Sequence, residues 1–165
     1  GISNYRPEEA AKAFKILKDL GTPCLIHQPN YNLFDRWIEN GLLDLLGNSG
    51  VGAICFSPLA QGMLTDKYIK GLPKDSRAVK DSPFLNTNQV LEMLPKIKAL
   101  HKVAESRNQS LAQMAISWIL QEKRITSVLI GASKTSQIID SVKAIENSVF
   151  SEKEIQEIET ILKAG

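Results

Sequence analysis

The stretch Ser127–Ser141, SVLIGASKTSQIIDS, decides how the rest of the chain is interpreted. Its apolar run Val128-Leu129-Ile130 predicts a short buried strand that ends at Gly131. A turn rich in Ser and Thr follows and leads into a helix with Gln137 near its start. The first turn of a helix leaves backbone N–H groups unpaired at the positive end of the helix dipole, where anions bind. The stretch therefore predicts either a phosphate site, to which Lys134 adds a charge, or an ordinary N-capped helix after a buried strand.

The composition limits the class of protein. With 165 residues, 43% of them apolar, the chain is long enough to bury one sizeable core. The net charge of +2 gives no sign of a nucleic-acid-binding surface. We expect no membrane span and no signal peptide, because no apolar run has the required length or flanks. Cys24 and Cys55 lie in apolar runs and are expected to be reduced thiols of a cytoplasmic protein, and neither His27 nor His101 belongs to a metal-binding pattern.

Apolar strands alternate with amphipathic helices along the chain, which is the pattern of parallel βαβ units in an α/β fold. Two further strands are expected, at Cys24-Leu25-Ile26 and at 51–56. Helices are expected after Arg6, over 41–47, and from about residue 88 or Pro95 to Arg107. A helix over 111–123 should be capped by Ser110, and a last helix should begin at a capping box formed by Ser151 and Glu154.

The segment 57–87 has little periodicity and is the most basic part of the chain. A loop of this length in a compact domain is usually functional or disordered. Two interpretations remain open, a mobile solvated loop or a flap over an anionic ligand.

Unusual polar residues follow each expected strand and precede none. They are Ser3-Asn4, His27-Gln28, Phe56-Ser57 and Gly131–Ser133. The carboxyl ends of parallel strands share one face of a barrel or open sheet, and that face carries the site. Because an eight-stranded barrel typically needs about 250 residues, the chain is either a small open sheet or the C-terminal part of a barrel.

Five ordered motifs resemble the C-terminal half of the aldo-keto reductases. They are GISNY at 1–5, IHQPNYN at 26–32, FSPLAQGMLTDKY at 56–68, SR at 76–77 and VLIGAS at 128–133, followed by Gln137. The resemblance is greatest to the branch with potassium-channel β subunits and L-glyceraldehyde 3-phosphate reductases. It implies a (β/α)8 barrel in which residues 1–165 form one partial domain that supplies strands six to eight, with Gly1 at the end of strand five.

The resemblance also implies which residues bind the nicotinamide. Ser3, Asn4 and Gln28 would hydrogen-bond its carboxamide, whose donor and acceptor suit amide and hydroxyl groups. Phe56 would stack on the ring and select the face that is presented for hydride transfer, although many relatives have Tyr or Trp there.

The same resemblance assigns the phosphates and the adenosine. The pyrophosphate would follow the backbone of Ser57, Leu59 and Gly62, and the phosphates would be held by Lys67, Arg77 and the turn Gly131–Ser133. A Lys and an Arg near the ribose favour NADP(H) over NAD(H), because a ribose 2′-hydroxyl would be matched by an acid. Gln137, Asp140 and Ser141 fall where relatives contact the adenosine, although relatives usually have Glu and Asn at the last two positions.

The implied activity is NADPH-dependent reduction of small aldehydes or ketones, with phosphorylated short-chain aldehydes as one candidate class. The Tyr, Asp, Lys and His that donate the proton in the family would all precede Gly1, so the chain alone is predicted to be inactive. We expect it to pair with the missing N-terminal half of the barrel or to form a homo-oligomer, since a half-barrel exposes apolar edges. Two alternatives are a cofactor-bound regulatory subunit resembling the channel β subunits and a phosphate-binding module with unrelated chemistry.

Overall fold

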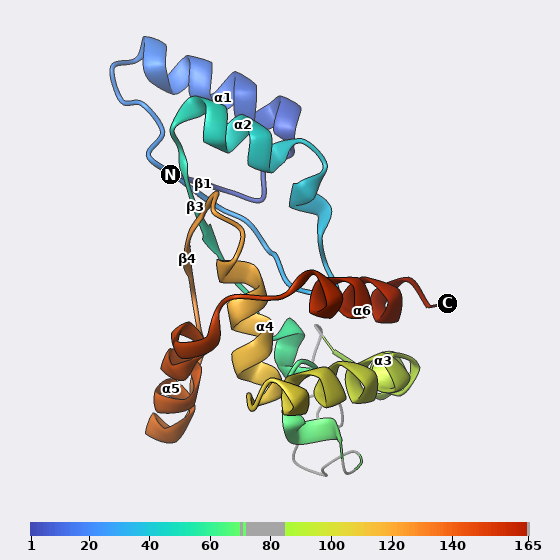
Figure 1. Ribbon diagram of the computed structural model, residues 1–165. Coiled ribbons are helices and arrows are strands. Elements are labelled where there is room, and N and C mark those ends of the chain that lie inside the picture. Colours follow the sequence, from blue (N-terminus) through green and yellow to red (C-terminus); the bar gives the residue numbers. More distant parts are fainter. Residues whose placement is uncertain (70, 72–84, 165) are drawn as a thin grey trace.

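Four parallel strands, in the spatial order β1-β2-β3-β4, form one sheet at the centre of the structure. The computed structural model describes residues 1–69, 71 and 85–164. The strands are β1 (Ile2–Ser3), β2 (Ile26–Gln28), β3 (Gly52–Cys55) and β4 (Ile125–Val128). The helices are α1 (Pro7–Asp19), α2 (Leu42–Ser49), α3 (Thr87–Ser106), α4 (Leu111–Leu120), α5 (Thr135–Val142) and α6 (Glu152–Lys163), with 3₁₀ turns η1 (Trp37–Glu39), η2 (Ala60–Gly62), η3 (Asp66–Tyr68) and η4 (Lys143–Asn147). Figure 1 shows α1 beside α2 at one end, α3 beside α6, and α5 at the lower left.

Side chains along β2 and β3 alternate between a buried face and a partly exposed face. His27, Ala53 and Cys55 are buried, and the last two join a core that includes Leu46 and Leu111 of the helices. The strands are therefore covered by helices on one face only, as in the wall of a barrel whose interior side is open.

Helix starts follow from local sequence. The hydroxyl oxygens of Ser110 and Ser151 each accept a hydrogen bond from the N–H three residues later, and the backbone N–H of each serine donates to the side chain of that later residue, which confirms the predicted caps. Asn86 and Gln89 form the same motif, so α3 begins at Thr87 and continues through Pro95.

Two strand predictions were displaced by two or three residues. The strand predicted at Cys24–Ile26 is Ile26–Gln28, because pairing with Ile2 and Ser3 sets its position. The strand predicted at Val128–Ile130 is Ile125–Val128, paired with β3 around a register shift, and Leu129 and Ile130 are exposed beyond it. Apolar composition indicates burial in a complete fold, whereas strand bounds depend on which backbone groups find partners.

The described helices include none that is long and apolar enough to cross a membrane. The described residues also contain no group of His, Cys, Asp and Glu arranged to hold a metal ion.

Candidate functional site

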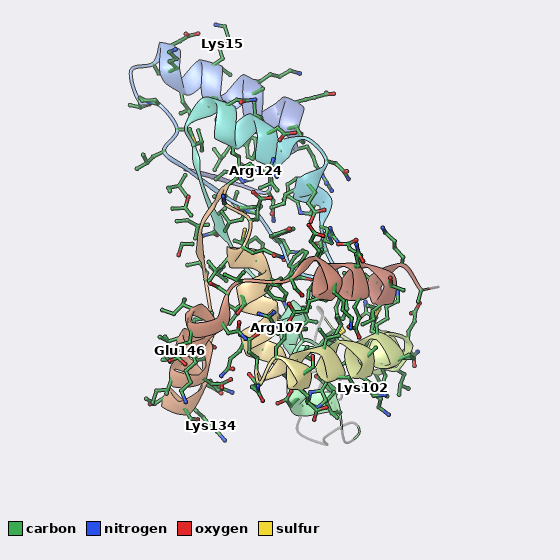
Figure 2. All side chains as sticks on the ribbon, in the orientation of Figure 1. Lys15, Lys102, Arg107, Arg124, Lys134 and Glu146 are labelled. Carbon is green, nitrogen blue, oxygen red and sulfur yellow. The ribbon has the colours of Figure 1, made fainter. Side chains whose placement is uncertain are left out.

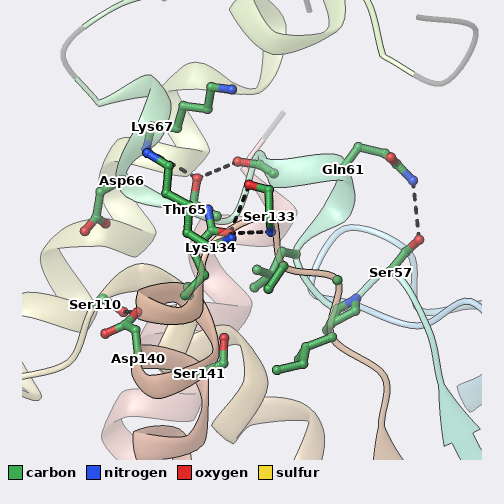
Figure 3. A pocket seen from close by; sticks show the side chains of 18 of the residues that line it. Ser57, Gln61, Thr65, Asp66, Lys67, Ser110, Ser133, Lys134, Asp140 and Ser141 are labelled. Carbon is green, nitrogen blue, oxygen red and sulfur yellow. Dashed lines mark hydrogen bonds between the residues drawn. The ribbon is translucent and has the colours of Figure 1, made fainter. Parts of the chain in front are cut away.

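A pocket of about 1160 Å³ opens where the chain leaves β3 and β4. One wall is the segment 56–67 with η2 and η3, the other is the segment 129–141 with the start of α5, and Ser110 and Ala112 of the α4 start lie between them. Figure 3 shows Lys67 and Thr65 on the first wall and Ser133, Asp140 and Ser141 on the second. Two loops that are far apart in the sequence thus face each other across one cavity.

Most of the predicted site residues line this pocket. They are Phe56, Ser57, Leu59, Gly62, Lys67, Gly131, Ser133, Gln137, Asp140 and Ser141. Arg77 lies outside the described residues. Their binding roles stay predictions.

Ser3, Asn4 and Gln28 do not line the pocket but lie in the same row of strand ends. Ser3 pairs with Gln28 in the sheet and donates its hydroxyl hydrogen bond to the Gln28 carbonyl at 2.7 Å. The Asn4 side-chain oxygen accepts a bond from the Asn30 N–H at 2.9 Å, and Asn30 forms a parallel bridge with Phe56. The row therefore runs without a break from β1 to the first residue of the pocket.

The first turn of α5 already holds a polar partner. The side-chain oxygen of Gln137 accepts bonds from the N–H groups of Ser133 at 2.8 Å and Lys134 at 3.2 Å. These are two of the groups expected to bind an anion, and Figure 3 draws the Ser133 contact. The turn is thus both a capped helix start and a cluster of N–H groups that face an open pocket.

Backbone strain is concentrated at the carboxyl ends of β1 to β4 and the loops that follow them, which we call the rim. Among the described residues, five that are not glycine have positive φ, and four of them are at the rim: Asn4, Ser57, Ala60 and Gln61. The left-handed region is costly for such residues and persists where surrounding structure imposes it, which is frequent at functional sites.

One residue that the sequence did not single out, Asn32, holds the backbone of the loop after β3 in place. Asn32 is buried, donates to the Ser57 carbonyl at 3.1 Å, and accepts bonds from the N–H groups of Phe34 and Asp35. Its position in the polar loop after β2 was visible, but its contact across 25 residues was not.

Comparison with known proteins gives a family. A family model described as "Aldo/keto reductase family" matches residues 1–163. The chain is 45% identical, over an alignment of 175 residues, to L-glyceraldehyde 3-phosphate reductase of Escherichia coli K12, with 100% of this chain and 49% of that protein covered. It is 38% identical over 152 residues to a probable voltage-gated potassium channel subunit beta of Arabidopsis thaliana, with 88% and 46% covered.

The solved structure of a glycerol dehydrogenase from Gluconobacter oxydans is also similar. Its TM-score is 0.73 at 26% identity, and the match covers 98% of this chain and 48% of that chain. The chain thus spans about half the length of the relatives that it matches.

Proposed function

The chain belongs to the aldo/keto reductase family, and we propose that the protein reduces small aldehydes or ketones with NADPH. The observation that carries the proposal is the pocket at the strand ends, where Lys67 on one wall faces the start of α5 on the other. The similarity to a bacterial L-glyceraldehyde 3-phosphate reductase supports a short phosphorylated aldehyde as the substrate.

The lining of the pocket fits a phosphorylated dinucleotide. Lys67 and Lys134 bring positive charge from opposite walls, and a phosphate that displaced the Gln137 side chain would take over the N–H groups of Ser133 and Lys134. A Cβ added at Gly131 would meet no atom within 4 Å, so the backbone there is open to a ligand. Asp66 and Asp140 also line the pocket, but their carboxylates bind α4, which leaves the lysines as the charges available to a phosphate.

When bound, the reduced nicotinamide supplies the hydride. The proposed task of this chain is to hold and orient that group. Asn4 and Gln28, with Ser3, offer amide and hydroxyl groups to a carboxamide, and Phe56 offers an aromatic face. Within the described part of the chain the Gln28 side chain makes no hydrogen bond, which supports its availability. Gln137 and Ser141 would contact the adenosine end.

We propose that the proton comes from residues outside this chain. Tyr31 donates to Glu39 at 2.7 Å in the core, and Tyr68 is buried. Neither of them, nor Tyr5, lines the pocket, whereas an acid catalyst must reach the reacting group. The chain alone should be inactive and should need the other half of the barrel. The two free thiols, Cys24 and Cys55, support a reducing compartment such as the cytoplasm.

A binding role without turnover is the second candidate, because plant channel β subunits are among the relatives. Steady-state NADPH oxidation by the intact protein with short aldehydes separates the two. Turnover supports the reductase, and tight NADPH binding without turnover supports the regulatory subunit.

Calorimetric titration of the intact protein with NADPH and with NADH tests the cofactor. We expect NADPH to bind more tightly, and Lys67→Met to weaken NADPH by about tenfold while changing NADH less, as loss of one charged contact to a phosphate predicts. Lys102→Met, on the exposed side of α3, is the matched control. Equal affinity for both nucleotides would remove the assignment of NADPH, and failure to bind either would overturn the proposed function.

A further inference from the structure

We infer that the first turn of α4 sets the separation of the two pocket walls, and that Asp140 and Asp66 are positioning residues bound to this turn. The inference rests on the proposed function, since it concerns how the same pocket is held in shape. The start of α4 lies between the walls, and a carboxylate from each wall reaches it. Figure 3 shows the Asp140 carboxylate beside Ser110.

Asp140 uses both of its carboxylate oxygens on α4. One accepts the Ser110 hydroxyl at 3.0 Å, and the other accepts the side-chain amide of Gln113 at 2.6 Å. Ser110 and Gln113 are also the two members of the α4 capping box, in which the Gln113 oxygen accepts the Ser110 N–H. One amide side chain therefore caps α4 with its oxygen and holds α5 with its nitrogen.

Asp66 fixes the opposite wall at the same place. Its Oδ1 accepts the N–H of Leu111 at 3.4 Å and lies 3.2 Å from Nδ1 of His101 on α3. The start of α4 carries partial positive charge, which favours both carboxylates. Because Lys67 directly follows Asp66, the bond between Asp66 and Leu111 also fixes the backbone position of Lys67, the proposed phosphate-binding residue.

The dependence of α5 on Asp140 follows from its lack of burial. Among the residues of α5, Thr135–Val142, none is buried. The next tie to α4 lies beyond the helix, where the Ser117 hydroxyl donates to the Ala144 carbonyl at 2.7 Å. Among the described hydrogen bonds, those of Asp140 are therefore the ones that join a side chain of α5 to the start of α4, and Ser133 and Gln137 lie just before Asp140 in the same wall of the pocket.

The alternative is that Asp140 contacts the adenosine directly. A substitution of Gln113 distinguishes a positioning role of Asp140 from a direct contact, because Gln113 binds Asp140 but does not line the pocket. The test is a double-mutant cycle of Gln113→Ala and Asp140→Ala in the intact protein, with NADPH affinity measured by calorimetry. We expect Gln113→Ala, which removes one charge-assisted bond to Asp140, to weaken binding by about tenfold, Asp140→Ala, which removes two, to weaken it by at least as much, and the double variant to lose little more than Asp140→Ala. Unchanged affinity in Gln113→Ala beside a loss in Asp140→Ala would overturn the inference in favour of a direct contact.

Gln89→Ala is the matched control, because Gln89 holds the same capping-box position in α3, away from the pocket. Amide hydrogen exchange of the free protein gives a readout that needs no nucleotide. We expect faster exchange at 133–137 in Gln113→Ala and Asp140→Ala but not in Gln89→Ala. If the wild type bound neither nucleotide, the proposed function would fail, but the exchange rates would still test the inference. Unchanged exchange in both Gln113→Ala and Asp140→Ala would refute the inference.

Discussion

At the scale of single residues, the buried side chain of His27 in β2 should make the stability of the protein depend on pH. His27 is 0% exposed, and its Nε2 lies 3.2 Å from the Tyr5 carbonyl. Burial disfavours the imidazolium and lowers the pKa of His27 below 6.5, while the bond to Tyr5 opposes the shift. The unfolded chain therefore binds a proton more readily than the folded one.

This difference predicts a loss of stability on acidification. The contribution of His27 is fully present above pH 6.5 and is lost as the pH falls toward its lower folded-state pKa. Urea unfolding at pH 7.5 and pH 5.5 should show a smaller pH difference in free energy for His27→Leu than for the wild type. An unchanged pH difference in the variant would assign the acid sensitivity to other groups.

At the scale of elements, Arg107 joins the end of α3 to the segment between η4 and α6. Its side chain is 2% exposed and donates to Glu154 at 2.6 Å and to the carbonyls of Asn147 at 2.8 Å and Val149 at 3.1 Å. The guanidinium also lies 3.7 Å from the ring centroid of Phe150. Figure 2 places Arg107 at the centre of the molecule among these elements.

Arg107→Ala should destabilise the protein by about 3 kcal/mol, because the buried guanidinium is removed and several partly buried acceptors, including the Glu154 carboxylate, lose their charged donor. The planar guanidinium reaches several acceptors at once, so Arg107→Lys should recover only part of the loss. Chemical denaturation at pH 7 measures both. Arg124→Ala, which breaks ion pairs at a side chain 39% exposed, is the control and should cost about 1 kcal/mol or less. Equal losses in the two Ala variants would contradict the role given to burial.

At the scale of the whole molecule, β1 and β4 each pair with a single strand within the described residues, so each leaves one edge unpaired. Apolar side chains are exposed at Leu25 before β2 and at Ile138, Val142 and Ile145 on α5 and η4. A complementary set of parallel strands that closed an eight-stranded barrel would cover both edges at once. The chain matches about half of a similar solved chain, and the other half-barrel is the partner that we propose.

The isolated chain is therefore expected to self-associate, and exchange of Val142 and Ile145 together for Lys should reduce that association. The same exchange should also weaken assembly with the complementary half-barrel. Sedimentation velocity measures both, with Leu91→Lys on α3 as a control for a single exposed apolar residue. A monodisperse wild-type monomer that melts cooperatively would argue against the exposed edges as binding surfaces.

The sequence by itself determined the order of helices and strands, the capped helix starts at Ser110 and Ser151, and the family, because these depend on local periodicity, capping and ordered motifs. It also indicated that polar residues would share one rim, since strands of one direction end on one side. Only the tertiary structure decided the limits of β2 and β4, the support of Ser57 by Asn32, and the meeting of Asp66 and Asp140 at α4. The physical reason is that hydrogen-bond partners separated by tens of residues are chosen by the packing of the whole sheet and its helices, and no local pattern records that choice.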